Sequence, residues 1–144
     1  MARNRLFVAA PPESVWAVLA DPDCYPRWVV GAKHIRSVEG SWPDPGSKFH
    51  HAVGVGPLEV RDNTEAVLAD APTHIVLDAR ARPLGRARID LSLEPAGGGT
   101  MVTMVEVPTS PAVVRALTPL LDPPTWARNR VSLRRLATLA ESQA

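Results

Sequence analysis

The alternation of apolar and polar residues from Lys33 to about Val107 constrains the fold of this chain more than any other feature. A period of two is typical of β-strands whose two faces meet different surroundings. The turn sequences GVGP at 54–57 and GGGT at 97–100 favour antiparallel hairpins. The alternation predicts six strands, at residues 33–39, 47–54, 58–68, 73–82, 86–94 and 100–107.

The two faces of the predicted sheet differ in polarity. One parity is apolar and comprises Phe49, Val53, Leu58, Val60, Leu77, Ala79, Ala81, Ile89, Leu91 and Leu93. The opposite parity is charged and comprises Glu59, Arg61, Glu65, Asp78, Arg80, Arg86, Arg88, Asp90 and Glu94. Because a sheet with one apolar face must cover that face, helices are expected to pack against it.

The segment before these strands predicts one further strand and two short helices. The strand is expected over Asn4–Ala10, and the run PPESVWAVLA at 11–20 has helical periodicity. Asp21 and Pro22 then provide an N-cap and a first helical residue for a second, very short helix. Pro26 is expected to end it.

The C-terminal segment predicts the longest helix, from Asp122 and Pro123 to about Glu141. A shorter segment that starts at Ser110 and Pro111 should precede it and be interrupted at Pro119. One arc of the long helix comprises Trp126, Asn129, Leu133, Leu136, Ala137 and Ala140, with Arg128 and Arg135 behind it and Arg130 and Arg134 to one side. Such arginines are most often a solvated helix back, although they could also attract an acidic membrane or a phosphate.

Composition limits the classes of protein to which the chain can belong. Its 144 residues, 45% of them apolar, suffice for a core, and we expect a single domain over residues 1–144. The single Cys24 excludes an internal disulfide framework and favours a cytoplasmic location. A net charge of +1 argues against nucleic acid as a partner. Without an apolar run of transmembrane length, no integral membrane association is expected.

Four stretches carry a resemblance to a known superfamily. They are APPESVWAVLADPDCYPRW at 10–28, GSKFHHAVGVGPLEV at 46–60, LEPAGGGTMVTMVE at 93–106 and NRVSLRRLATLAE at 129–141. In these motifs the chain resembles the START-like (SRPBCC, Bet v 1-like) superfamily, and within it the bacterial polyketide cyclase/dehydrase-type members. The resemblance implies an α+β helix-grip fold, in which a curved seven-stranded antiparallel sheet wraps around a long C-terminal helix. Two short helices lie between the first and second strands.

The same resemblance implies a cavity between the sheet and the last helix that holds an apolar small molecule. Residue types alone leave a filled core as an equal alternative. Tyr25 and Trp28 are expected at the pocket wall or its mouth, with Arg27 at the rim, or else they attach the short helices to the sheet. The residues predicted to contact a ligand are Tyr25, Trp28, Phe49, Val60, Leu77, Ile89, Leu91, Met104, Trp126, Asn129 and Leu133.

Four polar residues fall on the apolar positions of the pattern: His51, Asp62, Glu106 and Asn129. A carboxyl group in an apolar cavity has a raised pKa, and an imidazole can accept or relay its proton, so Asp62, Glu106 and His51 are candidate catalytic residues. The alternative is structural, because either acid could reach solvent or pair with a rim arginine such as Arg27, and His51 could be a core or rim histidine.

No metal or cofactor site is predicted. Adjacent residues on a strand point to opposite faces, so His50 and His51 cannot hold one ion from the same side. GVG at 54–56 precedes a strand rather than a helix, which excludes a nucleotide-binding loop. Cys24 has no neighbouring base in the sequence and is interpreted as a buried structural thiol.

Two functions therefore remain as the main alternatives. The first is a binding protein for a lipid-like, isoprenoid or polyketide-like molecule, as a monomer or a homodimer. The second is a polyketide cyclase/aromatase-type enzyme that uses pocket acids and a histidine for aldol cyclisation and dehydration. A third alternative, a partner-binding subunit like the co-chaperone members of the superfamily, would require an exposed apolar patch. Convergence of His51, Asp62 and Glu106 inside a closed cavity would favour the enzyme.

Overall fold

The computed structural model describes residues 1–55, 57–81, 85–109 and 118–143. Its elements are β1 (Ala2–Val8), α1 (Pro12–Leu19), the 3₁₀ turn η1 (Pro22–Cys24), α2 (Tyr25–Trp28), β2 (Ala32–Glu39), β3 (Lys48–Val55), β4 (Leu58–Asp70), β5 (His74–Ala81), β6 (Gly85–Ala96), β7 (Gly99–Pro108) and α4 (Thr118–Gln143). The predicted order of strand, short helices, six strands and long C-terminal helix is confirmed, with strand ends within two residues of their predicted positions.

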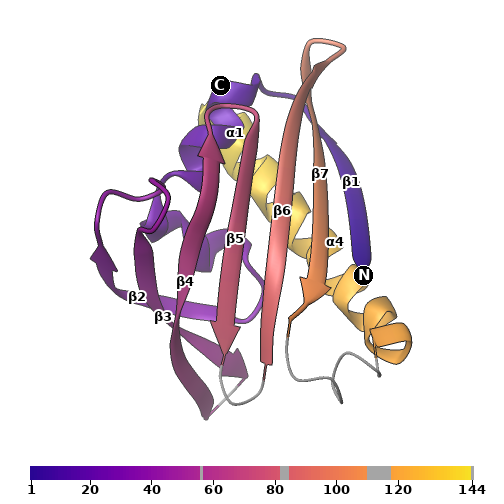
Figure 1. The fold of residues 1–144 in the computed structure, drawn as a ribbon. Helices are drawn as coiled ribbons and strands as arrows, with labels where there is room; N and C mark the ends of the chain where they lie inside the picture. Colours follow the sequence, from indigo (N-terminus) through magenta and orange to yellow (C-terminus); the bar gives the residue numbers. More distant parts are fainter. Residues whose placement is uncertain (56, 82–84, 110–117, 144) are drawn as a thin grey trace.

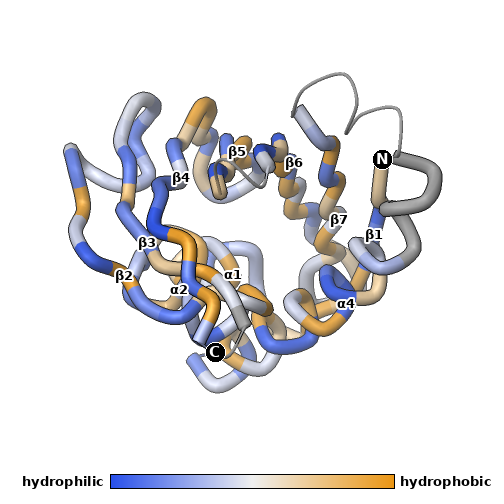
Figure 2. The backbone as a smooth tube through the Cα atoms, turned by 90° about the horizontal axis from the view of Figure 1, so that it is seen from below, coloured by the Kyte–Doolittle hydropathy of each residue, from blue (hydrophilic) through white to orange (hydrophobic). Residues whose placement is uncertain are grey.

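The strands form one antiparallel sheet in the order β1-β7-β6-β5-β4-β3-β2, so that β1 and β2 are its edges. The sheet curves, and α4 lies along its concave side while α1 and α2 lie at one end (Figures 1 and 2). This architecture confirms the helix-grip fold that the sequence motifs imply.

Glycines close the β6–β7 hairpin. Ala96 pairs with Gly99, and between them Gly97 and Gly98 have φ of +51° and +82°. A two-residue turn with positive φ at both positions matches the twist of the paired strands, and glycine adopts it without steric cost. This register places Ile89 opposite Glu106 on the concave face.

One arc of α4 packs against the concave face of the sheet. Its buried residues are Asn129, Ser132, Leu133, Leu136, Ala137 and Ala140. The apolar members join a core with buried strand residues such as Leu91, Leu93 and Val102. Trp126, predicted to share this arc, is instead 42% exposed. None of the described helices is long and apolar enough to cross a bilayer.

The start of the long helix was predicted wrongly. α4 begins at Thr118 rather than at Asp122, and Pro119 is its second residue. In the first turn of a helix the backbone N–H has no intrahelical acceptor, so a proline there helps to start the helix instead of interrupting it. The segment predicted to start at Ser110 lies, up to residue 117, outside the described residues.

Of the two prolines in DPDCYPRW, Pro22 has its predicted role and Pro26 does not. Pro22 opens η1, where the Asp21 carboxylate accepts a hydrogen bond of 3.0 Å from the Asp23 N–H, as an N-cap should. Pro26, however, lies inside α2, again in a first turn where no donor is needed. The chain leaves the helix only at Val29, which is extended.

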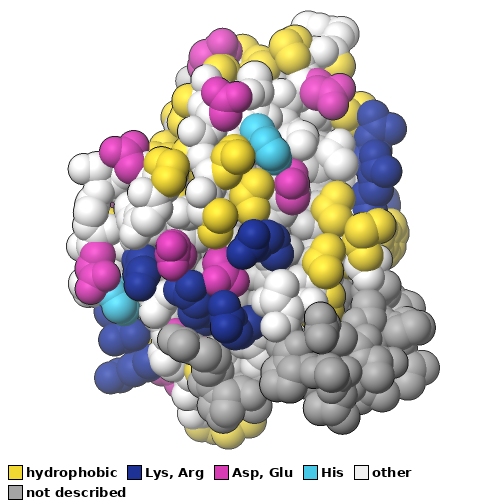
Figure 3. Space-filling model, in the orientation of Figure 1, with side chains coloured by type: hydrophobic (Ala, Val, Ile, Leu, Met, Phe, Trp, Pro, Cys, Tyr) yellow, Lys and Arg dark blue, Asp and Glu magenta, His cyan; other side chains and the backbone are white. Residues whose placement is uncertain are grey.

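The two faces of the sheet follow the predicted parity, but Leu58 and Asp78 differ from the expected exposure. The convex face is rich in charged side chains (Figure 3). Leu58, predicted on the apolar face, is 75% exposed because it lies at the tip of the β3–β4 hairpin. Asp78, predicted on the solvated face, is only 5% exposed, and its carboxylate is paired with Arg80 and Arg86.

Candidate functional site

A cavity of about 550 Å³ lies between the concave face of the sheet, α2 and the first half of α4. Its inner end is lined by buried residues such as Leu77 and Met104, and its outer end by more exposed groups such as Gly85 and Arg128. The apolar wall includes Trp28, Val53, Leu77, Ala79, Ile89 and Met104. The concave side is therefore only partly filled by side chains.

Two aromatic residues of α2 line this cavity. Tyr25 and Trp28 are 7% and 3% exposed, and their rings meet edge to face with centroids 5.8 Å apart. Tyr25 also packs on Phe49 of β3, with the ring centroids 4.5 Å apart. Both residues thus join the short helix to the sheet and form part of the pocket wall, so the two predicted roles are combined.

A charged group joins the sheet to α4 at the cavity. Glu106 on β7 is 9% exposed, and both its carboxylate oxygens lie 2.7 Å from Nη2 of Arg128. The Asn129 side-chain amide donates a further hydrogen bond of 3.3 Å to Oε1 of Glu106. All three residues line the cavity. Glu106 is thus inside the pocket, as its parity predicts, and paired with an arginine, as the structural alternative predicts.

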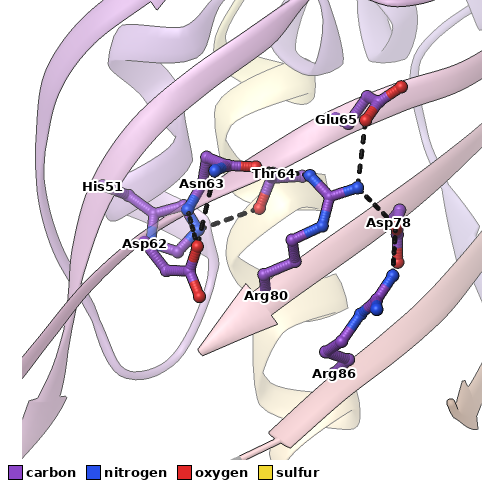
Figure 4. Close-up of polar contacts among 8 residues, drawn as sticks. All are labelled: His51, Asp62, Asn63, Thr64, Glu65, Asp78, Arg80 and Arg86. Atoms are coloured by element: carbon purple, nitrogen blue, oxygen red, sulfur yellow. Dashed lines mark hydrogen bonds and ion pairs between the residues drawn. The ribbon is translucent and has the colours of Figure 1, made fainter. Parts of the chain in front are cut away.

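The imidazole of His51 is buried at the same cavity, only 2% exposed. Its Nε2 lies 3.0 Å from the Thr64 hydroxyl, and its enclosed Nδ1 has no hydrogen-bond partner among the described residues (Figure 4). Burial lowers the pKa of His51, and the nearby Asp62 only partly offsets this effect. The ring is therefore neutral at neutral pH, and it can act on a ligand only through Thr64 or after rotating.

Tyr25 is the only tyrosine of the chain, and burial raises the pKa of its phenol to about 12. The negative charge of Glu106 acts in the same direction, while the Thr64 hydroxyl and the Arg128 guanidinium partly oppose it. At neutral pH the phenol is protonated, so it can donate a hydrogen bond to a molecule in the cavity.

Asp62 is cross-strand neighbour to His51 and is 7% exposed, but it is not part of the cavity wall. Its Oδ1 accepts hydrogen bonds from the backbone and side-chain amides of Asn63, at 2.9 and 3.4 Å. The three candidate catalytic residues thus have separate hydrogen-bond partners: Glu106 is held by Arg128 and His51 contacts Thr64. Asp62, beside His51 on the neighbouring strand, accepts from Asn63.

The other predicted ligand contacts separate into two groups. Tyr25, Trp28, Leu77, Ile89, Met104 and Asn129 line the cavity, whereas Phe49, Val60, Leu91, Trp126 and Leu133 do not. In the second group, Phe49, Leu91 and Leu133 are buried in the core and Val60 is half-buried. Trp126 lies on the outside of α4, beneath the guanidinium of Arg130.

The sequence analysis missed two residues of α4 that shape the cavity. Arg128 was placed behind the buried arc, but its long side chain reaches back to Glu106. Ser132 accepts a hydrogen bond of 3.0 Å from the Val30 N–H and so ties the loop after α2 to α4. Ser132 could have been predicted, because it lies three residues after Asn129 and therefore on the same side of the helix. Arg128 could not, because it contacts Glu106 only through the length of its side chain.

No cluster of histidine, cysteine or carboxylate side chains suited to a metal ion occurs in the described part of the chain. Nε2 of His50 instead lies 3.3 Å from a carboxylate oxygen of Glu39. Cys24 is buried, and its Sγ lies 3.4 Å from Oδ2 of Asp21. Both burial and this carboxylate raise the pKa of the thiol, which disfavours the reactive thiolate.

Comparison with known proteins gives one family match. The family described as "Polyketide cyclase / dehydrase and lipid transport" matches residues 3–141. No curated protein matches the chain in sequence.

Solved structures resemble this fold over nearly the whole chain. Protein NE0264 from Nitrosomonas europaea has a TM-score of 0.73 at 17% identity, covering 99% of this chain and 94% of its own. Ara h 8.0201 has a TM-score of 0.74 at 15% identity, covering 97% and 96%. The di-domain ARO/CYC StfQ from the steffimycin biosynthetic pathway has a TM-score of 0.73 at 17% identity, covering 98% of this chain and 50% of its own. At these identities the likeness shows a shared fold.

Proposed function

The chain belongs to the polyketide cyclase/dehydrase and lipid transport family, and we propose that it binds a hydrophobic small molecule in the cavity between the sheet and α4. The observation that carries this proposal is the cavity of about 550 Å³ with its largely apolar wall. Small-molecule sites commonly have volumes of roughly 300 to 1,000 Å³ and only a few polar groups. A lipid-like, isoprenoid or polyketide-like ligand fits this description.

The polar groups at the cavity favour an uncharged ligand. The carboxylate of Glu106 and the guanidinium of Arg128 neutralise each other, and the two other arginines of the cavity wall, Arg80 and Arg86, both pair with Asp78. An anionic ligand would be repelled by Glu106, and a cationic ligand by Arg128, unless the pair separates. The protonated phenol of Tyr25 can instead donate a hydrogen bond to an uncharged oxygen atom of the ligand.

Filling the cavity tests this proposal. Ala79→Phe introduces a large side chain at the cavity wall, whereas the same substitution at the exposed Ala127 on the outside of α4 is a matched control. Native mass spectrometry of protein purified from its own host is expected to detect a retained apolar molecule. The molecule should be lost from A79F and kept in A127F. Equal retention in both variants, or no retained molecule in the unmodified chain, would contradict the proposal.

A polyketide cyclase or dehydratase activity is the second candidate function. The observation in its favour is that Glu106 and the Tyr25 phenol line the same cavity. There the phenol could donate a hydrogen bond that polarises a carbonyl, and the carboxylate could accept a proton from the adjacent carbon. Base catalysis by His51 and Asp62 has weaker support, because Nδ1 of His51 is enclosed and Asp62 lies outside the wall. Binding without chemistry therefore has the stronger support.

The two functions separate when the residues are changed individually. Tyr25→Phe keeps an aromatic ring in the cavity wall, so a binding protein should retain an apolar ligand in this variant. An enzyme that needs the phenol should lose the conversion of a polyketide-like substrate by about 10²-fold or more. A linear poly-β-ketone analogue, followed by mass spectrometry for loss of water, is the probe. Turnover by the unmodified protein that Y25F abolishes would establish the second function.

A further inference from the structure

The outward surface of α4 carries an unusual group of side chains, which we call the arginine face. It consists of Trp126, Arg130, Val131, Arg134 and Arg135, all of them exposed. Around the helix they extend from Trp126, at the edge of the buried arc, to Val131 and Arg135 on its outer side, and none of them lines the cavity. The face does not contribute to the pocket, so its composition needs another explanation.

Positive charge is concentrated on this face. Residues 124–140 contain four arginines and no aspartate or glutamate, although the whole chain has a net charge of only +1. One of the four, Arg128, pairs with Glu106. Within the described residues, Arg130, Arg134 and Arg135 form no ion pair, in contrast to Arg61, Arg80 and Arg86 on the sheet. Their charges are therefore available to an anionic partner.

Apolar groups lie among these charges. Trp126 is 42% exposed and Val131 is 41% exposed. The guanidinium carbon of Arg130 lies 5.5 Å from the centre of the Trp126 ring, so the indole is held at the surface by a cation–π contact. A helix that presents arginines together with tryptophan and valine combines the two attractions that hold a protein at the interface of a lipid bilayer.

We propose that the arginine face of α4 docks onto an anionic membrane surface. The guanidinium groups would contact lipid phosphates while their aliphatic stems, Trp126 and Val131 enter the headgroup region. A nucleic acid would use the charges but not the exposed valine and indole, whereas an acidic protein could use both and is therefore an outcome of the test below. Docking by this face is independent of what the cavity holds, so it can be tested separately from the proposed function.

The test measures co-sedimentation of the full chain with lipid vesicles. Neutral phosphatidylcholine vesicles are compared with vesicles that also contain phosphatidylglycerol, at a near-physiological salt concentration. The protein is expected to bind only the anionic vesicles. A triple variant, Arg130→Glu with Arg134→Glu and Arg135→Glu, should bind them at least about tenfold more weakly.

The matched control reverses three exposed arginines of the sheet, Arg5→Glu, Arg61→Glu and Arg88→Glu. It changes the net charge by the same amount and should bind nearly as well as the unmodified chain. Trp126→Ala should also weaken binding although it changes no charge. Circular dichroism establishes that each variant is folded.

Three results would overturn the proposal. The first is that the unmodified protein pellets equally with neutral and anionic vesicles, or with neither. The second is that both triple variants lose binding to the same extent, which would show that net charge rather than this face matters. The third is that Trp126→Ala binds as well as the unmodified chain while a soluble polyanion such as heparin displaces the protein completely, which would point to a nucleic acid or acidic protein as the partner.

Discussion

An arginine–carboxylate cluster lies at each face of the sheet, and the two clusters differ in how completely they are enclosed. On the convex face, Arg80 is 13% exposed and bonds to Asn63, Glu65 and Asp78 on β4 and β5 (Figure 4). On the concave face, Arg128 is 43% exposed and reaches from α4 to Glu106 on β7. The first cluster ties neighbouring strands to each other, although its Arg80 and Arg86 also adjoin the cavity. The second ties the helix to the sheet at that cavity.

The residue types of an ion pair do not by themselves determine its structural role, because that role also depends on burial and on the elements that the pair joins. The guanidinium of Arg80 has three partners and little contact with water, so its task is structural. The guanidinium of Arg128 is half in solvent and lines the cavity. The same residue types therefore join neighbouring strands in one place and join a helix to the sheet in the other.

The largest effect is expected on the convex face. Arg80→Ala should lower the free energy of unfolding by about 3 kcal/mol, because it leaves the carboxylate of Asp78, 7% exposed, without its closest positive partner. Urea denaturation followed by tryptophan fluorescence measures the change. Arg61→Ala is the control, since its pair with Glu59 is exposed and should contribute less than about 1 kcal/mol. Equal losses would show that burial of the cluster does not matter.

Next in size is the ionisation of Tyr25 at the cavity. As the only tyrosine, it can be titrated directly by the ultraviolet absorbance of its phenolate. The midpoint should lie near pH 12 in the folded protein and near 10 in denaturant. The folded state thus keeps the proton longer, so the stability that Tyr25 contributes is present below pH 10 and is lost as the pH rises toward 12. A midpoint near 10 in the folded state would mean that the phenol is solvated.

A smaller effect is expected at the concave cluster. Arg128→Ala should destabilise the fold by only about 1 kcal/mol, because Asn129 still donates to Glu106 and water in the cavity can reach the carboxylate. Arg135→Ala, exposed on the same helix, should change the stability by less than about 0.5 kcal/mol. A loss at Arg128 as large as that at Arg80 would remove the contrast between the two clusters.

The smallest effect concerns the pH dependence contributed by His51. Its pKa is lowered in the folded state, so the unfolded chain binds a proton first as the pH falls below about 6.5. The stability contributed by the neutral ring is complete above that pH and is lost as the pH falls. His51→Gln should therefore show a flatter decline in stability between about pH 7 and 5. An unchanged decline would indicate that His51 is protonated as easily as in the unfolded chain.

Much of this fold could be predicted from the sequence because its signals are local. The alternation along β3 to β7 and the glycines of the β6–β7 turn specify strands without reference to distant residues. The errors occurred at prolines, because a proline can end a helix or occupy its first turn. Pro26 and Pro119 were read as stops, but each lies in a first helical turn, where the missing N–H costs nothing.

The site was harder to predict than the fold. The alternation of the strands correctly predicted that His51 and Glu106 line the cavity. It also predicted this of Asp62, which is not part of the cavity wall. Parity states which face a side chain takes, but it does not state where a curved sheet leaves space. Trp126 was misassigned for a related reason, because it lies at the edge of the buried arc and that edge depends on the packing of α4.

Local sequence patterns were enough to predict the strands, their apolar and charged faces, the turns and the long C-terminal helix. Each of these features depends on residues only a few positions apart. Only the tertiary structure decided which carboxylate pairs with which arginine, because Glu106 and Arg128 come from different elements. It also decided that the cavity remains partly open and that His51 turns its Nε2 to Thr64. These outcomes depend on the placement of α4 against a curved sheet and on side-chain reach, and no short-range pattern encodes either.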